Sequence, residues 1–462
     1  MDPRDHSWTW HTLVHVGRRW RAIIFASPHR LDLRLLCKHG TPVRDGLKYW
    51  PPLPIIIDYA DDVRLLPPTP QDEDHILAAL AQPDRVCRVE VVAQASLFEK
   101  LFIVMQQQFP ELTHVRLWCT DSRPGPWCTG IQPAVPAITD NFFGGSVPRL
   151  RSLSLSGIPI PALPGILPSA VDLISLRLLA IPDINYILPE CMVTCLSALT
   201  RLKSLTIGFQ SFTPRPEQGR HPLPLIPVIL PGLTDFSFEA GSDYYLDDFL
   251  ARIDTPLLKN LYVTVFHPPS FEIPIEIPHL SRFILHTTGL TLPNAATMYS
   301  DYHTVFITLH QSVSANGNGN GRLFQLGISC EPSSWQVSNL ARLCSEYLAP
   351  LLADVKQLYI GPNLDCIWWE EMVDDLWHWL VVLRPFTSVE SLHISDLPDF
   401  AYVLEEMAKD AVMGETVEEM LPALRMIQFE GSHQHIPIEE FVAMRQRSGR
   451  PVNVRHRRPR LP

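Results

Sequence analysis

A short apolar phrase recurs along this chain and constrains its fold more than any other feature. Each copy has an apolar residue, two residues of any type, a second apolar residue, one residue of any type, and a third apolar residue. The clearest copies are Leu150-Leu153-Leu155, Leu173-Leu176-Leu178, Leu202-Leu205-Ile207, Leu233-Phe236-Phe238, Leu258-Leu261-Val263 and Leu280-Phe283-Leu285. Fainter copies are Val86-Val89-Val91, Leu112-Val115-Leu117, Leu323-Leu326-Ile328, Val355-Leu358-Ile360, Val389-Leu392-Ile394 and Leu424-Ile427-Phe429. Because a repeated unit buries its apolar face against its neighbours, the twelve copies predict a solenoid.

The phrase has the period of a β-strand. Its last two apolar residues are two positions apart and therefore point to the same side of an extended chain. The residues between and beside them point the other way and are mostly polar, as Ser152, Ser154 and Ser156 are in one copy. This is the strand pattern of leucine-rich repeats, and the chain resembles that class over most of its length.

The spacing of the copies predicts an irregular solenoid. First positions of successive copies lie between 22 and 43 residues apart, whereas regular leucine-rich repeats run about 20–29 residues. The Asn or Cys that usually follows the third apolar position by three residues is also missing. Ile158, Ile181, Gln210 and Phe266 stand there instead. We therefore expect insertions between turns and no asparagine ladder linking them.

Several of the longer intervals have helical periodicity. The expected helices are QDEDHILAALAQ (71–82), LFEKLFIVMQQQ (97–108), SWQVSNLARLCSEYLAPLL (334–352) and WWEEMVDDLWHWLVVL (368–383). In the last segment Trp368, Met372, Leu376, Trp379 and Leu383 recur at helical spacing, which marks a buried stripe. The predicted fold class is α/β: an irregular leucine-rich-repeat solenoid with a parallel β-strand face and with helices and loops on the convex side.

An amphipathic helix is expected ahead of the repeats. Leu13, Val16, Trp20 and Ile24 recur at the spacing of one helix face. One interpretation is a capping helix that covers the first turn of the solenoid, since solenoids need polar caps at their ends.

A second interpretation comes from a family resemblance. The segment VGRRWRAIIFASPHRLDLRL (16–35) resembles the second half of an F-box, as it occurs in fungal, basidiomycete-type F-box-like proteins with leucine-rich repeats. The leucine-proline start and the first helix of the box are missing from the 19 residues ahead of Trp20, and Gly17 stands where F-boxes usually carry Cys. Further phrases of the same family are WPPLPIIIDY (50–59), FFGGSVPRLRSLSLSGI (142–158), ILPECMVTCLSALTRLKSL (187–205) and DDFLARIDTPLLKNL (247–261).

The resemblance implies a function. Such proteins are non-enzymatic substrate-recognition subunits of SCF-type cullin ubiquitin ligases, which hold a client near the ubiquitin-charged enzyme. By this resemblance a Skp1-type adaptor would contact Leu13, Val16, Trp20 and Ile24. The alternative is a leucine-rich-repeat scaffold that binds a protein but has lost Skp1 binding.

The chain is therefore divided into three predicted parts. Residues 1–37 form the partial F-box-like helical segment, 38–444 the solenoid, and 445–462 an arginine-rich tail. The segment IPIEEFVAMRQRSGR predicts a closing helix that ends near Gly449. The tail has seven arginines between residues 445 and 460, which predicts a solvated end or, alternatively, a nuclear-import signal.

Composition narrows the partners and the compartment. A net charge of −11 argues against nucleic-acid binding by the whole body. No stretch of about 20 apolar residues is available to span a bilayer, and MDPRDHSWTW does not resemble a signal peptide. The nine scattered cysteines include no CxxC pair, which predicts a reduced cytoplasmic or nuclear protein.

No catalytic or cofactor motif is found in the sequence. It has no GxxxxGK[ST], GxGxxG, HExxH or GxSxG, so we expect neither an enzyme nor a cofactor. Glu371, Asp374 or Asp375, and His378 share a helix face and could bind a metal ion, but a solvated face is the favoured interpretation. His433 and His435 lack a third ligand, and a Cys119–Cys128 disulfide is disfavoured by the expected compartment.

The outward side chains of the strands are the predicted client-binding surface. They mix both charge signs with aromatic groups, a composition suited to binding a protein. The candidates are Arg116, Trp118, Arg177, Asp235, Glu239, Tyr262, Arg282, His286 and His393, with Trp118, Tyr262 and Arg282 as the expected main contributors.

Overall fold

The structure, a computed structural model, has two compact units. The N-terminal unit is Met1–Ser211 with Leu230–Leu233, and the C-terminal unit is Phe212–Ile229 with Thr234–Pro462. The described residues are 17–26, 33–41, 43–49, 52–60, 68–121, 135–182, 187–210, 226–240, 243–267, 277–287, 293–301, 304–310, 322–330, 334–361, 376–395, 400–401, 403–405, 408, 420–430 and 438–457.

Within its described residues the N-terminal unit has seven parallel strands in chain order. The strands are β1 (Leu35–Cys37), β2 (Ile55–Tyr59), β3 (Val86–Ala93), β4 (His114–Cys119), β5 (Ser152–Ser156), β6 (Ser175–Ile181) and β7 (Ser204–Phe209). The predicted parallel strand face is therefore confirmed here.

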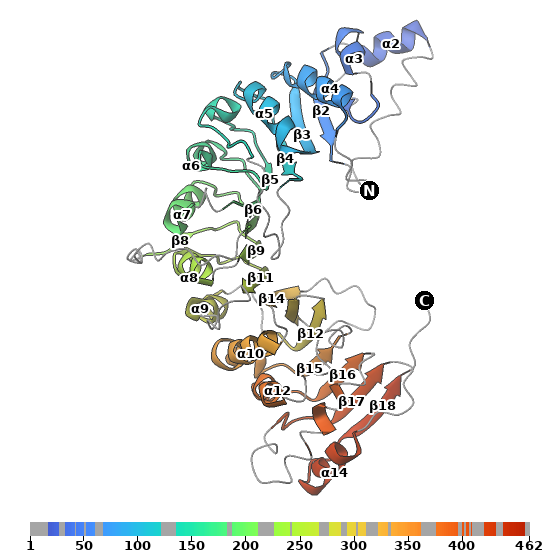
Figure 1. Cartoon of the computed structure of the whole chain (residues 1–462), viewed down its shortest axis with the longest axis vertical. Coiled ribbons are helices and arrows are strands. Elements are labelled where there is room, and N and C mark those ends of the chain that lie inside the picture. Colours follow the sequence, from blue (N-terminus) through green and yellow to red (C-terminus); the bar gives the residue numbers. More distant parts are fainter. Residues whose placement is uncertain are drawn as a thin grey trace. The chain divides into compact units, whose positions relative to one another are not determined.

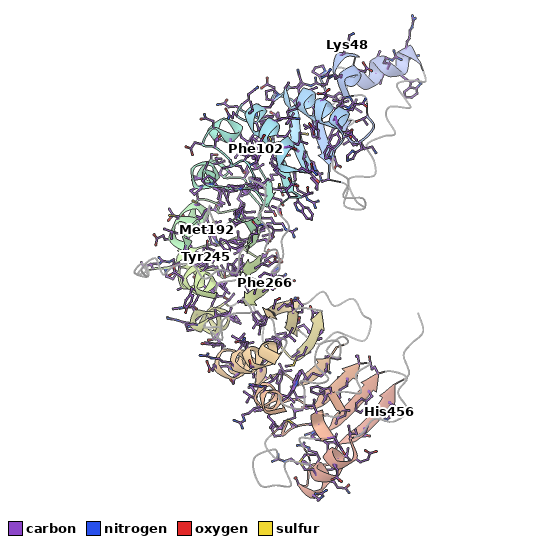
Figure 2. The ribbon with its side chains drawn as sticks, viewed as in Figure 1. Lys48, Phe102, Met192, Tyr245, Phe266 and His456 are labelled. Atoms are coloured by element: carbon purple, nitrogen blue, oxygen red, sulfur yellow. The ribbon has the colours of Figure 1, made fainter. Side chains whose placement is uncertain are left out.

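Helices line one side of this sheet (Figure 1). They are α3 (Val43–Tyr49), α4 (Pro70–Leu80), α5 (Ala95–Val104), α6 (Leu163–Ile166) and α7 (Pro189–Ser197), with the 3-10 turns η2 (Phe142–Gly145) and η3 (Leu167–Ser169). Helix α2 (Arg18–Phe25) precedes them in the chain, and its residues 18–23 are exposed. Figure 2 labels Phe102 on α5 and Met192 on α7, and both side chains are buried. The core of the unit thus lies between the helices and the sheet.

The C-terminal unit has a sheet of different order, β9-β11-β14-β13-β12-β15-β16-β17-β18. Strand β13 runs antiparallel to both of its neighbours, and the other pairings are parallel. The prediction of a parallel face is therefore incomplete at this place. The strands are β9 (Asp235–Ala240), β11 (Asn260–His267), β12 (Ala295–Asp301), β13 (Thr304–His310), β14 (Arg322–Cys330), β15 (Gln357–Ile360), β16 (Ser391–Ser395), β17 (Met426–Glu430) and β18 (Asn453–Arg457), and β8 (Val228–Ile229) pairs separately with β10 (Ile253–Asp254).

Helices accompany these strands as well. They are α8 (Asp243–Ala251), α9 (Pro278–His286), α10 (Ser334–Arg342), the π-helical turn η5 (Leu343–Tyr347), α11 (Ala349–Leu352), α12 (Leu376–Leu383) and α14 (Glu439–Arg447). In the predicted helix 368–383, Trp379 and Leu383 are fully buried on α12 as expected, while Trp368 and Met372 lie outside the described residues.

The recurrent phrase builds most of the repeats in the same way. Its first apolar residue closes a turn by donating its N–H to the carbonyl three residues earlier, as Leu150 does to Val147 (3.1 Å) and Leu173 to Ala170 (3.0 Å). Its second and third apolar residues then point into the core, where each removes apolar surface from water. Eleven of the twelve predicted copies lie in strands β3 to β7, β9, β11 and β14 to β17.

The strand prediction for Leu280-Phe283-Leu285 is wrong, because this segment is helix α9. Let the first apolar residue of the phrase be position 0. A strand and a helix both bury positions 0 and 3, but a strand also buries position 5, whereas a helix buries position 4. Ile284 is 5% exposed and Leu285 53% exposed, which is the helical pattern. Pro278 at the start of the helix favours this outcome, as does Asp247, whose carboxylate accepts from the His279 N–H at 2.7 Å.

Strands β12 and β13 were not predicted from the sequence. Strand β12 is a degenerate copy of the phrase, Pro293-Ala296-Met298, in which all three residues are buried. Because proline and alanine contribute little apolar signal, the copy is not recognisable beside those built from leucine.

Strands lie within both of the segments predicted as the end parts of the chain. Strand β1 pairs with β2, so the sheet begins within the segment predicted as the F-box-like part, 1–37. At the other end α14 runs to Arg447, close to the predicted helix end at Gly449, and β18 then pairs in parallel with β17. Strand β18 therefore lies within the predicted arginine-rich tail, 445–462, and its residues Asn453, Arg455 and His456 are exposed to solvent.

The pattern of α9 yields a direct test. Ile284→Ala should lower the free energy of unfolding by about 2–4 kcal/mol, because it leaves a cavity beneath the helix. Leu285→Ala, the matched control, should change it by no more than about 0.5 kcal/mol, as is usual for an exposed residue. Urea unfolding followed by far-UV circular dichroism measures both, and the reverse order of effects would mean that the segment is a strand.

Candidate binding surface

Outward side chains of the N-terminal unit align in rows across the strands. Arg116 on β4, Ser154 on β5 and Arg177 on β6 are register partners and form one row. The neighbouring row consists of Trp118, Ser156 and Leu179 on the same strands. Alternation within each strand sends these residues away from the core, in which Leu117, Leu155 and Leu178 are buried. Ser156 is buried as well, at 7% exposure.

Charges concentrate where β3 and β4 meet. Glu90 is almost fully buried and is ion-paired with Arg88 on its own strand. His114 is the register partner of Arg88, and its Nδ1 lies 2.8 Å from the Thr113 hydroxyl. Burial lowers the pKa of His114, and the positive charge of Arg88 lowers it further. The imidazole is therefore neutral at pH 7 and adds no charge to this part of the surface.

The C-terminal unit has an aromatic patch, defined here as Tyr299, Phe306, His310, Tyr359 and His393. The Tyr299 and Phe306 rings stack with centroids 4.9 Å apart, and the Tyr359 and His393 rings stack at 4.4 Å. The His310 ring lies 6.1 Å from that of Tyr359, and its Nε2 is 2.9 Å from the Thr297 hydroxyl. All five side chains are half-buried, so each keeps part of its ring exposed to solvent.

Two glycines make room for the patch. A Cβ on Gly327 would lie 2.6 and 2.9 Å from two ring carbons of Phe306, so the ring sits directly on the β14 backbone. A Cβ on Gly361 would lie 3.0 Å from the Cβ of Tyr299. The patch therefore depends on the inserted pair β12–β13 and on these glycines together.

The Tyr359 phenol is held within the patch. Its hydroxyl donates to Gln357 Oε1 at 3.1 Å. Burial raises the pKa of Tyr359 above its ordinary value, and the nearby Glu430 carboxylate acts in the same direction. The phenol is therefore neutral at physiological pH and available as a hydrogen-bonding group at the edge of an apolar ring.

Some predicted client-binding residues lie on the strands as expected. Trp118, Arg116 and Arg177 are together in the N-terminal unit, and His393 belongs to the aromatic patch. Asp235, Glu239 and Tyr262 lie on β9 and β11 in the C-terminal unit, where Asp235 accepts a hydrogen bond from Asn260 Nδ2 at 2.6 Å.

Arg282 and His286 do not lie on the strand face, because they belong to helix α9. Sequence reasoning also missed Tyr299, Phe306 and Tyr359. Tyr359 was detectable as the residue between Leu358 and Ile360 in a predicted strand copy, whereas Tyr299 and Phe306 lie on strands that had no clear signal.

Helix α2 exposes two apolar side chains. Trp20 is 52% exposed and Ile23 50% exposed, and their spacing of three puts them on one face. Of the other predicted adaptor contacts, Leu13 and Val16 lie outside the described residues, as does the side chain of Ile24.

The weaker chemical hypotheses gain no support. Among the described residues no group of three His, Cys, Asp or Glu side chains could hold a metal ion. Glu371, Asp374 and Asp375 lie outside that set, as do Cys128, His433 and His435, while His378 is half-buried on α12 and Cys119 is buried. No described helix is both long enough and apolar enough to cross a bilayer.

Comparison with known proteins adds little. No protein-family model matches the chain, and no curated protein matches it. The crystal structure of the leucine-rich repeat-containing protein LegL7 from Legionella pneumophila is similar, with 12% identity and a TM-score of 0.28 over 90% of this chain and 98% of that one. At that score the likeness carries no argument, and the leucine-rich-repeat fold rests on the strands, registers and burial described above.

The glycine beneath Phe306 can be tested by substitution. Gly327→Ala should displace the ring, lower the free energy of unfolding by about 1–3 kcal/mol and change the near-UV circular dichroism of the Tyr299–Phe306 pair. Gly165→Ala is the matched control, because a Cβ there meets nothing within 4 Å. On helix α6 that substitution should be neutral or stabilise by up to roughly 1 kcal/mol. Equal effects of the two substitutions would show that Phe306 does not rest on Gly327.

Proposed function

We propose that this chain is a non-enzymatic repeat protein that binds a client protein through the outward faces of its strands. The observation that carries the proposal is the aromatic patch of the C-terminal unit. Binding energy in protein interfaces concentrates in aromatic and arginine side chains that are already held in place. Stacking fixes the Tyr359 and His393 rings before any partner arrives, so little side-chain entropy is lost on binding.

The surroundings of the patch favour a protein partner. Gln357, Thr297 and Gln325 are half-buried on its strands and offer donors and acceptors beside the rings. Apolar rings with amide and hydroxyl groups around them match the composition of protein interfaces. A client that covers the patch would bury the exposed ring faces, and these polar groups would form the rim of the interface.

Removal of the central ring tests client binding. Tyr359→Ser should lower partner recovery by about tenfold or more in quantitative affinity purification of the tagged full-length chain, as expected for a hot-spot residue. Tyr244→Ser is the control, because Tyr244 is 49% exposed on helix α8 and not on the strand face. An unchanged partner set for a correctly folded Tyr359→Ser protein would contradict the proposal.

The finer proposal is a substrate receptor of an SCF-type cullin ligase. It is supported by the F-box-like sequence around α2 and by the exposure of Trp20 and Ile23 on that helix. An unpaired apolar helix face is what an adaptor would cover. The alternative is a scaffold of the same fold that binds its client without a Skp1-type adaptor. In either role we place the protein in the cytoplasm, the nucleus or both, and Arg-rich residues 445–460 remain a candidate nuclear-import signal.

Binding to a purified Skp1-type adaptor distinguishes the substrate-receptor role from the scaffold role. The full-length chain should bind it, and Trp20→Ala should weaken the dissociation constant by about tenfold or more, since a half-exposed tryptophan is a typical anchor. Ile103→Ala is the control, because Ile103 is 71% exposed on α5, away from α2. Isothermal titration measures both variants. If the unmodified chain did not bind the adaptor, the substrate-receptor role would be contradicted and the scaffold role would remain.

A further inference from the structure

Strand β18 is the last strand in the sheet of the C-terminal unit (Figure 1). It pairs in parallel with β17, and no other strand pairs with it among the described residues. The Asn453 N–H donates to the carbonyl of Arg425, the residue directly before β17, at 2.9 Å. Because the main-chain groups of successive strand residues point to opposite sides, those of Asn453 and Arg455 face β17. Val454 and His456 therefore present their N–H and carbonyl groups at the outer edge.

The core side of β18 is less covered than the core side of β17. Val454 and His456 are the register partners of Ile427 and Phe429, which are both buried. On β18 itself Val454 is half-buried and His456 is exposed. The His456 ring, labelled in Figure 2, stacks on that of Phe429 with the centroids 5.5 Å apart. Apolar side chains on a further strand, opposite Val454 and His456, would remove this remaining surface from water.

The outward face of β18 is cationic. Arg455 is exposed and is the register partner of Gln428, which pairs in turn with His393 of the aromatic patch. The segment 449–462 contains five arginines and no Asp or Glu. The outward carboxylate of β17, Glu430, accepts a hydrogen bond from Gln428 Nε2 at 3.1 Å. A carboxylate opposite Arg455 on a further strand would form a favourable cross-strand pair, whereas a lysine there would be repelled.

The same charge disfavours a second copy of this chain at the edge. Pairing β18 with another β18 would bring two arginine-rich segments together, and like charges on adjacent strands are destabilising. Charged side chains on an edge strand are also a common device against unwanted strand pairing. An acidic strand is the occupant that this device does not repel.

We propose that the outer edge of β18 binds an extended segment of a partner protein, which joins the sheet as a further strand. Large apolar residues of the segment lie opposite Val454 and His456, and an Asp or Glu between them lies opposite Arg455. Main-chain hydrogen bonds provide affinity, and the alternation of apolar and acidic side chains provides specificity. The edge is separate from the aromatic patch, so this inference does not rest on the proposed client binding.

The test uses fluorescein-labelled peptides and the purified full-length chain. The peptides have about ten residues, which is enough to cover the five residues of β18. One peptide alternates Val and Glu, and the comparison peptides alternate Val and Gln, alternate Val and Lys, or contain the Val and Glu residues in blocks. Fluorescence anisotropy at about 50 mM salt should show the alternating Val-Glu peptide bound about fivefold more tightly than each comparison peptide. Its advantage over the Val-Gln peptide should shrink at about 300 mM salt, because salt screens exposed charges.

Two variants at His456 separate main-chain pairing from side-chain contacts. His456→Pro removes an N–H from the outer edge, and proline is tolerated on an edge strand where this group faces away from the sheet. His456→Ala is the matched control, because it removes the same ring from Phe429 and keeps the N–H. His456→Pro should bind the Val-Glu peptide about five- to tenfold more weakly than His456→Ala, as expected for lost main-chain pairing. Thermal unfolding of the two variants should be alike.

Variants at Arg455 assign the charge preference. Arg455→Gln should narrow the preference for the Val-Glu peptide over the Val-Gln peptide, and Arg455→Glu should abolish it, because the added carboxylate repels the acidic peptide. Arg384→Gln is the control, since it removes the same charge from an exposed position directly after α12 in the same unit. It should leave the preference unchanged.

Methylated peptides test the edge without any change to the protein. An added strand bonds to β18 through alternate residues only. Of two Val-Glu peptides, one N-methylated on its valines and the other on its glutamates, only one should therefore lose binding. Which of them does so shows whether the added strand runs parallel or antiparallel to β18. Equal binding of the unmethylated peptide and both methylated peptides would overturn the inference.

Other results would overturn it as well. They are failure of the Val-Glu peptide to bind, equal binding by His456→Pro and His456→Ala, and an acidic preference that survives in Arg455→Glu. Dimerisation of the chain in analytical ultracentrifugation that is lost in His456→Pro would assign the edge to a second copy. Tighter binding of a labelled single-stranded oligonucleotide would assign the arginines to nucleic acid. The proposed client binding is judged separately, by the partner set of the Tyr359→Ser protein.

Discussion

Backbone hydrogen bonds at the start of many of the strands hold the repeats in register. The Thr113 carbonyl accepts from the N–H groups of both Arg151 and Ser152, at 2.8 and 3.1 Å. The same two-donor arrangement recurs at the carbonyls of Arg151, Ile174, Thr234, Asn294, Lys356 and Glu390, which accept from the residue pairs 174–175, 203–204, 259–260, 356–357, 390–391 and 425–426. Because these bonds involve only the main chain, they do not depend on which side chain stands at the junction. They take the place of the missing asparagine ladder and leave the length of the intervening segment unconstrained.

Fixed register has a consequence for the surface. A slip of one residue would turn every outward side chain into the core, so the ladder and the buried apolar residues together determine which side chains stand next to each other. The Tyr359–His393 stack and the Arg116–Ser154–Arg177 row both follow from this. The outward residues are otherwise free to vary, which is why a solenoid with an ordinary core can present an aromatic patch in one unit and a row that contains Arg116 and Arg177 in the other.

The apolar pattern of the sequence was sufficient to predict most strands, but it did not predict most of the aromatic patch. Eleven phrase copies were recognisable because leucine, isoleucine, valine and phenylalanine occupy positions whose burial the strand period requires. Leu280-Phe283-Leu285 failed because its first two positions fit a helix equally well, and Ile284 settles the choice only in three dimensions. Strand β12 failed because Pro293 and Ala296 are weak signals. Without β12 and β13 the stack of Tyr299 on Phe306 could not be anticipated, since it joins residues of two unrecognised antiparallel strands.

Helix ends show the same limit of local reasoning. The residues that precede α5, α9 and α14 make no side-chain cap, so the usual N-cap signal is missing from the sequence there. Carboxylates from distant positions serve instead: Asp121 accepts from the Ala95 N–H at 2.8 Å, and the buried Glu405 accepts from the Glu440 N–H at 3.1 Å. Each carboxylate also faces the positive end of the helix dipole. Asp121 follows β4 in the sequence and caps α5, the helix that precedes β4. The cap therefore links α5 to the strand that comes after it. The backbone ladder therefore sets the spacing of the strands, and these long-range caps hold the helices against them.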